Sequence, residues 1–261
     1  MSLIGTWKGS NGSIITLGGS GPNKLVGTYK PTIKSADAYT LIGYQTTSRS
    51  TPNADQAVSL AIRWHSLAGP LDTSAHWVSG LTGPLVHHRG TQRLILTHAI
   101  VASTDFPGLA TAGTYIDKVI YTLVSTEVPE PPPQTSKGNI AVADPIEGRW
   151  FSHDGTSLLI QSAIPDSAGV PGQVFGTLNY KGRISDIQGL TDFDASTAGL
   201  GLQSVAMVGL LNDSAGPAIA LAGVVEIDYK LITLLELQSS LTAALNTHLR
   251  TTVSSQVFLK I

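Results

Sequence analysis

The chain contains no cysteine, few charged residues and no long apolar run. Without cysteine it can form neither a disulfide nor a thiolate nucleophile, although this absence identifies no compartment. Charged residues make up only 13% of the chain, with a net charge of −2 and no run of Lys or Arg, so no basic surface for nucleic acid or an anionic membrane is expected. No apolar stretch approaches the roughly 20 residues of a membrane helix, and the first residues lack a signal-peptide pattern. We expect a soluble protein, cytoplasmic unless a leader was removed, with neither nucleic acid nor membrane as partner.

The 261 residues include 27 glycines and 14 prolines, which suits many short strands joined by tight turns. In "VSLAIRWH" one set of alternating residues is apolar, which predicts a strand with one face on a core; this set is Val58, Leu60, Ile62 and Trp64. In "RLILTHAIV" (93–101), "SVAMVGLL" (204–211) and "AIALAGVVEI" (218–227) both faces are largely apolar. We therefore expect two barrels to pack through the outer sides of their late strands.

A proline-rich stretch divides the chain into two similar halves. Residues 125–145, "STEVPEPPPQTSKGNIAVADP", hold five prolines and no apolar period, which is typical of an extended linker. On either side the same series of segments recurs in the same order: "GTWKGSNGSIITL" with "GRWFSHDGTSLLI", "LVGTY" with "VFGTL", "RLILTHAI" with "KLITLLEL", and "VIYTLV" with "QVFLKI". The predicted units are a first barrel at 1–125, a linker at 126–145 and a second barrel at 146–261.

About eight strands are predicted per half. In the first half they fall near 5–9, 13–17, 24–31, 39–46, 57–66, 74–82, 92–103 and 114–124. The predicted fold is all-β, with two tandem eight-stranded antiparallel up-and-down β-barrels, each with a lumen wide enough for one small ligand. Two alternatives stay open: a single two-sheet sandwich, and a short helix within 234–249, where leucines recur at helical spacing.

The first half resembles the avidin and streptavidin family, whose subunit is an eight-stranded barrel that binds biotin in its mouth. The segments "GTWKGSNGS", "LVGTY", "YTLIGY", "VSLAIRW" and "SAHWVSG" follow the family's order over nearly all of residues 4–124. The second half is a weaker match, carried by "GRWFSHDGT", "VFGT" and the strand order. A tandem pair departs from the usual single-barrel subunit and suggests that one chain supplies what two subunits supply elsewhere. The resemblance also implies a homo-oligomer, here a four-barrel assembly packed through late strands.

The resemblance implies a ligand site in the first barrel. Ser13 and Tyr29 fall on the hydroxyls that contact the ureido oxygen of biotin, whereas Gly9 replaces an asparagine, with Ser10 and Asn11 as possible substitutes. Of the other candidate ligand-binding residues, Trp64 matches a tryptophan that forms a wall of the family's site, and Trp77 and His98 are further candidate wall residues. Ser74 and His76 match residues near the tail of biotin. Asp117 is the candidate acceptor for a ureido N–H, because Val119 holds the position of the family's own acceptor.

The second half departs further from the family. Leu178 replaces the tyrosine, and Gly209 and Leu235 replace two tryptophans. We expect an interior of Leu, Ile and Val that does not bind biotin, because each unpaired buried polar group of the ligand costs about 1–3 kcal/mol. Trp7 and Trp150, by contrast, are expected to close the end of each barrel.

The predicted function is non-covalent binding of a small ligand in the first barrel, either biotin bound weakly or another apolar molecule, with no cofactor and no metal. One alternative is a cofactor-free cyclase or isomerase that uses Tyr29, His98 and His76. His76 and His98 are predicted to face inward on neighbouring strands, where they could form a metal site or an acid–base pair, although no third ligand stands at a recognisable spacing. Another alternative is a lectin or defence protein that uses loops at 45–56 and 82–91, with His87 and His88 in the second loop.

Overall fold

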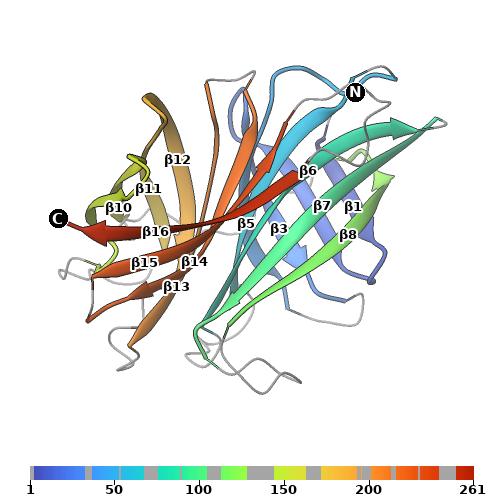
Figure 1. Ribbon diagram of the computed structural model, residues 1–261. Helices are drawn as coiled ribbons and strands as arrows, with labels where there is room; N and C mark the ends of the chain where they lie inside the picture. The colour runs from blue at the N-terminus through green and yellow to red at the C-terminus, as the bar shows by residue number, and fades with distance from the viewer. Residues whose placement is uncertain are drawn as a thin grey trace.

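The chain folds into two closed antiparallel barrels in tandem, each with eight strands (Figure 1). The computed structural model describes residues 3–32, 37–52, 54–67, 76–88, 90–104, 113–127, 144–162, 172–192, 195, 201–212, 216–228, 230–240 and 251–261. The predicted fold class is confirmed, and the single-sandwich alternative is wrong, because each sheet closes on itself. Within the described ranges no helix is long and apolar enough to cross a membrane.

In the first barrel, each strand pairs with the next one in the chain and the last pairs with the first. Across this closure, Trp7 lies opposite Leu123 and Gly9 opposite Tyr121. The strands are β1 (Gly5–Gly9), β2 (Ile14–Gly19), β3 (Lys24–Lys30), β4 (Tyr39–Gln45), β5 (Gln56–Ser66), β6 (Trp77–His88), β7 (Thr91–Ala102) and β8 (Gly113–Ser125).

The predicted strands agree with these except at β6. The loop expected at 82–91 is wrong, because β6 continues to His88 and pairs with β7 up to Thr91, so His87 and His88 are strand residues. Gly83 and Pro84 suggested a turn. Gly83 instead allows close packing of strands, since a Cβ there would overlap the carbonyl oxygen of Ile95.

The second barrel repeats this order and closes through β16 and β9. Its strands are β9 (Gly148–Ser152), β10 (Ser157–Ser162), β11 (Gln173–Tyr180), β12 (Arg183–Thr191), β13 (Leu202–Leu210), β14 (Ala218–Glu226), β15 (Leu231–Ser239) and β16 (Thr251–Lys260). Residues 234–239 are strand, so the helix alternative is wrong there, while 241–250 lie outside the described residues. Most of the predicted linker, 128–143, also lies outside them.

Trp7 and Trp150 occupy the same place in the two barrels. Each is fully buried in the apolar interior of its barrel. Each also donates its indole N–H to the carbonyl four residues earlier, Leu3 for Trp7 (2.9 Å) and Ile146 for Trp150 (2.8 Å). A large ring with a satisfied N–H is a stable core element, which confirms a shared structural role for the two residues.

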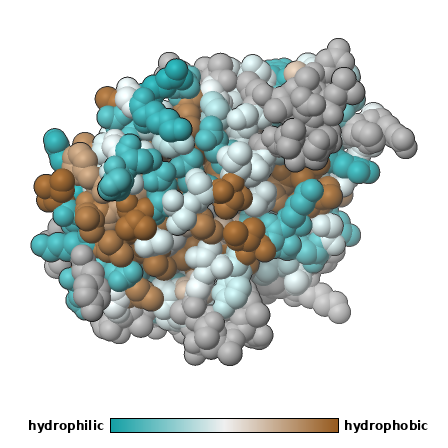
Figure 2. Space-filling view, viewed as in Figure 1, coloured by the Kyte–Doolittle hydropathy of each residue, from teal (hydrophilic) through white to brown (hydrophobic). Residues whose placement is uncertain are grey.

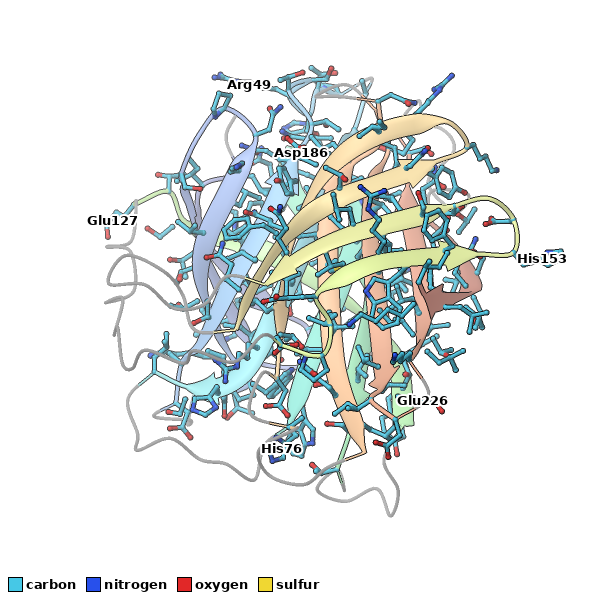
Figure 3. The ribbon with its side chains drawn as sticks, turned by 90° about the vertical axis from the view of Figure 1, so that its left-hand side faces the viewer. Arg49, His76, Glu127, His153, Asp186 and Glu226 are labelled. Carbon is cyan, nitrogen blue, oxygen red and sulfur yellow. The ribbon has the colours of Figure 1, made fainter. Side chains whose placement is uncertain are left out.

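The barrels lie side by side and pack through their outer faces (Figures 1 and 3). This interface is rich in alanine: Ala57, Ala61, Ala99, Ala206, Ala218, Ala220 and Ala222 belong to it. It confirms the predicted barrel-on-barrel packing and extends it beyond the late strands to β4 and β5. Side chains also bond across it, since Ser59 donates to the Gly209 carbonyl (3.3 Å) and Gln188 to the Gly43 carbonyl (3.3 Å).

A close approach of the barrels at Gly80 gives a stability prediction. A Cβ at Gly80 would lie 2.8 Å from the Cβ of Ala222 in the other barrel. Gly80→Ala should therefore lower the free energy of unfolding by about 1–3 kcal/mol through overpacking, measured by denaturant titration. Gly18→Ala is the control, because a Cβ there would meet only the Val26 carbonyl oxygen at 3.6 Å. Adding Ala222→Gly should restore part of the loss, and equal effects of the two single variants would contradict this account.

Candidate functional site

Three hydroxyl groups from separate segments meet inside the first barrel. Ser13 follows the Asn11-Gly12 turn and is fully buried, Tyr29 belongs to β3, and Tyr121 belongs to β8. The hydroxyls of Ser13 and Tyr121 are hydrogen-bonded at 3.1 Å, and the Ser13 side chain lies close enough to the Tyr29 phenol to act on its pKa. Burial is the main reason that the pKa values of Tyr29 and Tyr121 lie above the usual value. Both phenols therefore stay neutral and can donate hydrogen bonds at neutral pH.

The turn completes this cluster. Ser13 Oγ donates to Asn11 Oδ1 (2.6 Å), and the Ser13 backbone N–H contacts the same oxygen at 3.1 Å. A Cβ at Gly9 would come within 2.6 Å of Ser13 Oγ and 2.7 Å of Asn11 Oδ1. Glycine at position 9 thus leaves room for Asn11, the substitute suggested from the sequence. Ser10 does not join the cluster and instead accepts the Ile120 N–H (3.4 Å).

Four aromatic rings continue the inner surface beside the hydroxyls. The centroid of the Trp64 ring lies 5.2 Å from that of Tyr29, 5.2 Å from that of Tyr39 and 6.2 Å from that of Trp77. Trp64 is 9% exposed and donates its indole N–H to Ser79 Oγ (2.7 Å). The structure therefore brings together the predicted site residues Ser13, Tyr29, Trp64 and Trp77. Aromatic faces next to hydroxyl donors are typical of small-molecule sites.

His98 adds a buried polar side chain to this interior. It lies on β7, is 2% exposed, and its Nε2 has no hydrogen-bond partner among the residues that the structure describes. Burial lowers the pKa of His98 to about 4, although the nearby Asp117 carboxylate acts in the opposite direction. The ring is therefore neutral at pH 7, with one ring nitrogen as donor and the other as acceptor.

Asp117 lies opposite His98 in the β7–β8 pairing, on the same face of β8 as Tyr121. Its side chain is exposed, and its Oδ1 accepts the Lys118 backbone N–H (2.6 Å). The Asp117 charge contributes to the raised pKa values of Tyr29 and Tyr121, so the carboxylate is close enough to act on the cluster. It therefore adds an acceptor at the exposed end of this inner face.

The prediction that His76 faces inward is wrong. The Nδ1 of His76 contacts Asp192 Oδ2 of the second barrel, and Ser204 Oγ donates to the His76 carbonyl at 3.2 Å. Within β6 the inward residues are Trp77 and Ser79, whereas Val78 belongs to the interface between the barrels. The predicted register was shifted by one residue, and such a shift exchanges the two faces of a strand.

Two corrections to the predicted site follow from this register. Because His76 and His98 lie on opposite sides of the barrel wall, they cannot form a metal site or an acid–base pair with each other. Val78, on the same side of the barrel wall as His76, likewise packs in the interface between the barrels. Ser74 lies outside the described residues.

The sequence interpretation missed Tyr39, Ser79 and Tyr121. Tyr121 was detectable, because the alternation that places Asp117 and Val119 on one face also places Tyr121 there. Tyr39 begins the quoted segment "YTLIGY" and lies opposite Tyr29. Ser79 was hidden by the same one-residue error that misplaced His76.

In the second barrel, most matching positions are apolar. Around the barrel, the pairing places Leu178 where the first barrel has Tyr29, Leu211 where it has Trp64 and Phe258 where it has Tyr121. These residues and their buried neighbours make the interior apolar at these positions, as expected, whereas Ser185 and Glu236 add polar groups to it. Two matches from the sequence are wrong: Leu211, rather than Gly209, matches Trp64, and Leu235 packs toward the interface between the barrels.

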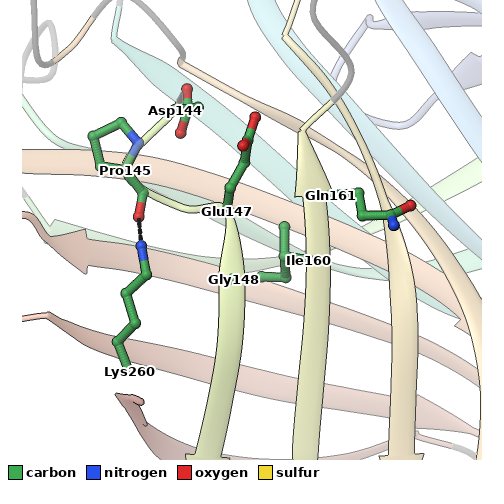
Figure 4. Close-up of a pocket in the computed structure, with 7 residues that line it drawn as sticks. All are labelled: Asp144, Pro145, Glu147, Gly148, Ile160, Gln161 and Lys260. Carbon is green, nitrogen blue, oxygen red and sulfur yellow. Dashed lines mark hydrogen bonds between the residues drawn. The ribbon is translucent and has the colours of Figure 1, made fainter. Parts of the chain in front are cut away.

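An open depression of about 540 Å³ lies beside the start of β9 (Figure 4). It is lined by Asp144, Pro145, Glu147, Gly148, Ile160, Gln161 and Lys260. Lys260 Nζ donates to the Pro145 carbonyl (2.7 Å), and Asp144 accepts from Gln203 (2.9 Å). Because these polar groups are hydrogen-bonded within the chain, the depression is a weaker candidate for a ligand site than the interior of the first barrel.

Buried His98 gives a pH prediction. Its pKa is lower in the folded protein than in the unfolded chain, so between pH 6.5 and about 4 the unfolded chain binds more protons. The His98 contribution to stability is thus complete above pH 6.5 and is lost as the pH falls to 4, by on the order of 3 kcal/mol. Denaturant unfolding at pH 7 and pH 4 should show a smaller loss for His98→Gln than for the unchanged protein. Exposed His153 provides the control His153→Gln, and equal losses in both variants would contradict the prediction.

Comparisons with known proteins do not indicate a function for this chain. No protein-family model matches the chain, and no curated protein matches it. The likeness to the avidin and streptavidin family therefore rests on the residues quoted above. A barrel fold does not by itself specify a function, so the chemistry of the inner surface carries the conclusion.

Proposed function

We propose that the first barrel binds a small ligand non-covalently within its interior. The observation that carries this proposal is the convergence of the hydroxyls of Ser13, Tyr29 and Tyr121 beside the ring of Trp64. Hydroxyl donors in an apolar setting can hold a carbonyl oxygen, and their hydrogen bonds are stronger there than in water. Biotin, the ligand that the resemblance implies, carries such an oxygen on its ureido group.

His98 supports a ligand with a polar group at a second point. Its unpartnered ring nitrogen is buried, and leaving such a group unpaired costs on the order of 1–3 kcal/mol. A ligand that bonds to it recovers this free energy. Since His98 stands where the family has a tryptophan, and Val119 where it has an acidic or amide residue, we propose weak binding of biotin or binding of another apolar molecule.

The site favours binding over proton transfer. A general acid or base works best with a pKa near the operating pH, whereas the pKa of His98 is about 4 and those of Tyr29 and Tyr121 are raised. With His76 outside the barrel, the proposed cyclase or isomerase chemistry loses one of its three candidate groups.

Calorimetry with biotin on the intact chain tests the proposal. We expect saturable heat with one site per chain. Tyr29→Phe and Ser13→Ala should each weaken binding by about 2- to 13-fold, the equivalent of one hydrogen bond worth 0.5–1.5 kcal/mol.

Thr156→Ala is the matched control, because Thr156 holds the place of Ser13 in the second barrel, two residues before Leu158. It should leave the affinity for biotin unchanged. Absence of both heat and thermal stabilisation at high biotin would contradict biotin as the ligand. If only Thr156→Ala lost biotin binding, the site would lie in the second barrel, which would contradict the proposal.

We also propose that two chains associate into a four-barrel assembly. The late-strand faces that led to this expectation are already covered within the chain, by the other barrel. Apolar side chains nevertheless gather on the exposed surface on the side of the second barrel (Figure 2). On the outer face of that barrel, Phe151 of β9 lies opposite Leu259 of β16, and the two residues are 41% and 57% exposed. The first barrel has Lys8 and Thr122 paired at the matching positions. A second copy that covers this face would remove apolar surface from water.

Sedimentation analysis tests this association. We expect a mass of twice 27.3 kDa, and Leu259→Lys should shift the protein toward a single chain. Thr122→Lys is the control at the matching position of the first barrel and should leave the mass unchanged. A single-chain mass for the unchanged protein at micromolar concentration would contradict the proposal.

A further inference from the structure

The second barrel places a carboxyl group where the first barrel has His98. In the first barrel, His98 lies opposite Leu81 of β6 and Asp117 of β8. In the second, Glu236 lies opposite Leu221 of β14 and Ser254 of β16, which are the matching positions. Glu236 therefore faces inward from β15. The sequence repeat concealed this, because "RLILTHAI" and "KLITLLEL" align His98 with Leu235.

Glu236 is a buried acid that has no ion-pair partner in the described part of the chain. Its side chain is 4% exposed, and the Tyr180 hydroxyl donates to Oε1 at 3.1 Å. The side chain of Gln256 also lies close enough to lower the pKa of Glu236, but burial is the main cause and raises it. A buried carboxylate is costly without an opposite charge. Lys181, whose Nζ lies 5.1 Å from the centroid of the Tyr180 ring, supplies an opposite charge nearby. No ion pair joins Lys181 to Glu236 among the described residues, so that requirement is only partly met.

The neighbouring polar groups are partly bonded to each other. Gln256 accepts from Ser152 Oγ (3.0 Å) and donates to Asp154 Oδ2 (3.1 Å). These bonds hold the Gln256 amide beside Glu236. They come from β9, the β9–β10 turn and β16, so the position of the acid is set by several segments.

Ser185 is a second buried polar group that is available to a ligand in this barrel. It lies on β12, opposite Leu178 and on the inward face that it shares with Ile187. It is 6% exposed, and among the described residues its Oγ has no hydrogen-bond partner. In the first barrel, Tyr39 holds this place and packs against Trp64. Ser185 thus replaces the aromatic ring of Tyr39 with a small hydroxyl group, which provides a hydrogen-bond acceptor but no aromatic wall.

We propose that the second barrel binds a small organic cation, a primary amine with an apolar body. The ammonium group would be placed against Glu236, with the oxygen atoms of Tyr180 and Ser185 as further acceptors. The apolar body would contact Leu178, Leu211 and Phe258, which occupy the positions of the aromatic and hydroxyl residues of the first barrel. This site is independent of the function proposed for the first barrel and differs from it in charge.

Titration calorimetry of the intact chain with 2-phenylethylamine at pH 7 tests the proposal, with neutral 2-phenylethanol as the matched probe. We expect saturable binding of the amine and at least tenfold weaker binding of the alcohol. Glu236→Gln keeps the shape of the side chain and removes its charge, and it should weaken amine binding at least tenfold. Glu226→Gln, at the far end of β14 (Figure 3), is the charge-matched control and should bind the amine normally.

Tyr180→Phe provides a second variant that keeps the carboxylate, and it should weaken amine binding by a few fold. The amine should leave the biotin titration of the first barrel unchanged, so failure of one site is distinguishable from failure of the other. Three results would each overturn the proposal: no amine binding up to millimolar concentration, equal binding of amine and alcohol, or unchanged amine binding in Glu236→Gln.

Discussion

Closure of each sheet on itself is the constraint on which the rest of this structure depends. Because β8 must pair with β1, and β16 with β9, the register of every strand is linked to that of all the others. A side chain then faces inward or outward by its position alone, and a slip at one strand cannot be absorbed without breaking the ring. The same linkage makes residue-by-residue comparison of the two barrels possible. It is the comparison that identifies Glu236, rather than Leu235, as the counterpart of His98.

Much of the fold was predictable from the sequence, because alternation, turn residues and the internal repeat all act locally. The inward set Val58, Leu60, Ile62 and Trp64 is buried as expected. The apolar outer faces are covered by the partner barrel. The extent of β6 was not predictable in this way, since Gly83 and Pro84 carry the local signature of a turn. Only the neighbouring strands show that the glycine serves close packing.

The candidate site was predictable only in part, because its residues depend on the strand register of the closed sheet. Ser13, Tyr29 and Trp64 lie in segments where the repeat and the alternation agree, and the structure brings them together. His76 lies just before β6, where a one-residue error moves it from the inside of the barrel to the interface. Tyr121 alternates with Val119 and Asp117 on one face of β8, so its inward position follows from the same pattern. The polar cluster of the second barrel depends on contacts between β11 and β15 that no local pattern contains.

The interface between the barrels is not symmetric in its chemistry. The contact between His76 and Asp192 occurs once, and so does the hydrogen bond from Ser59 to the Gly209 carbonyl. A pair of identical subunits related by a two-fold axis would have to make each such contact twice. Joining the barrels in one chain removes that requirement and fixes their ratio at one to one. Each half can then change its interior without imposing the same change on the other, so a duplicated barrel becomes two separately adjustable compartments.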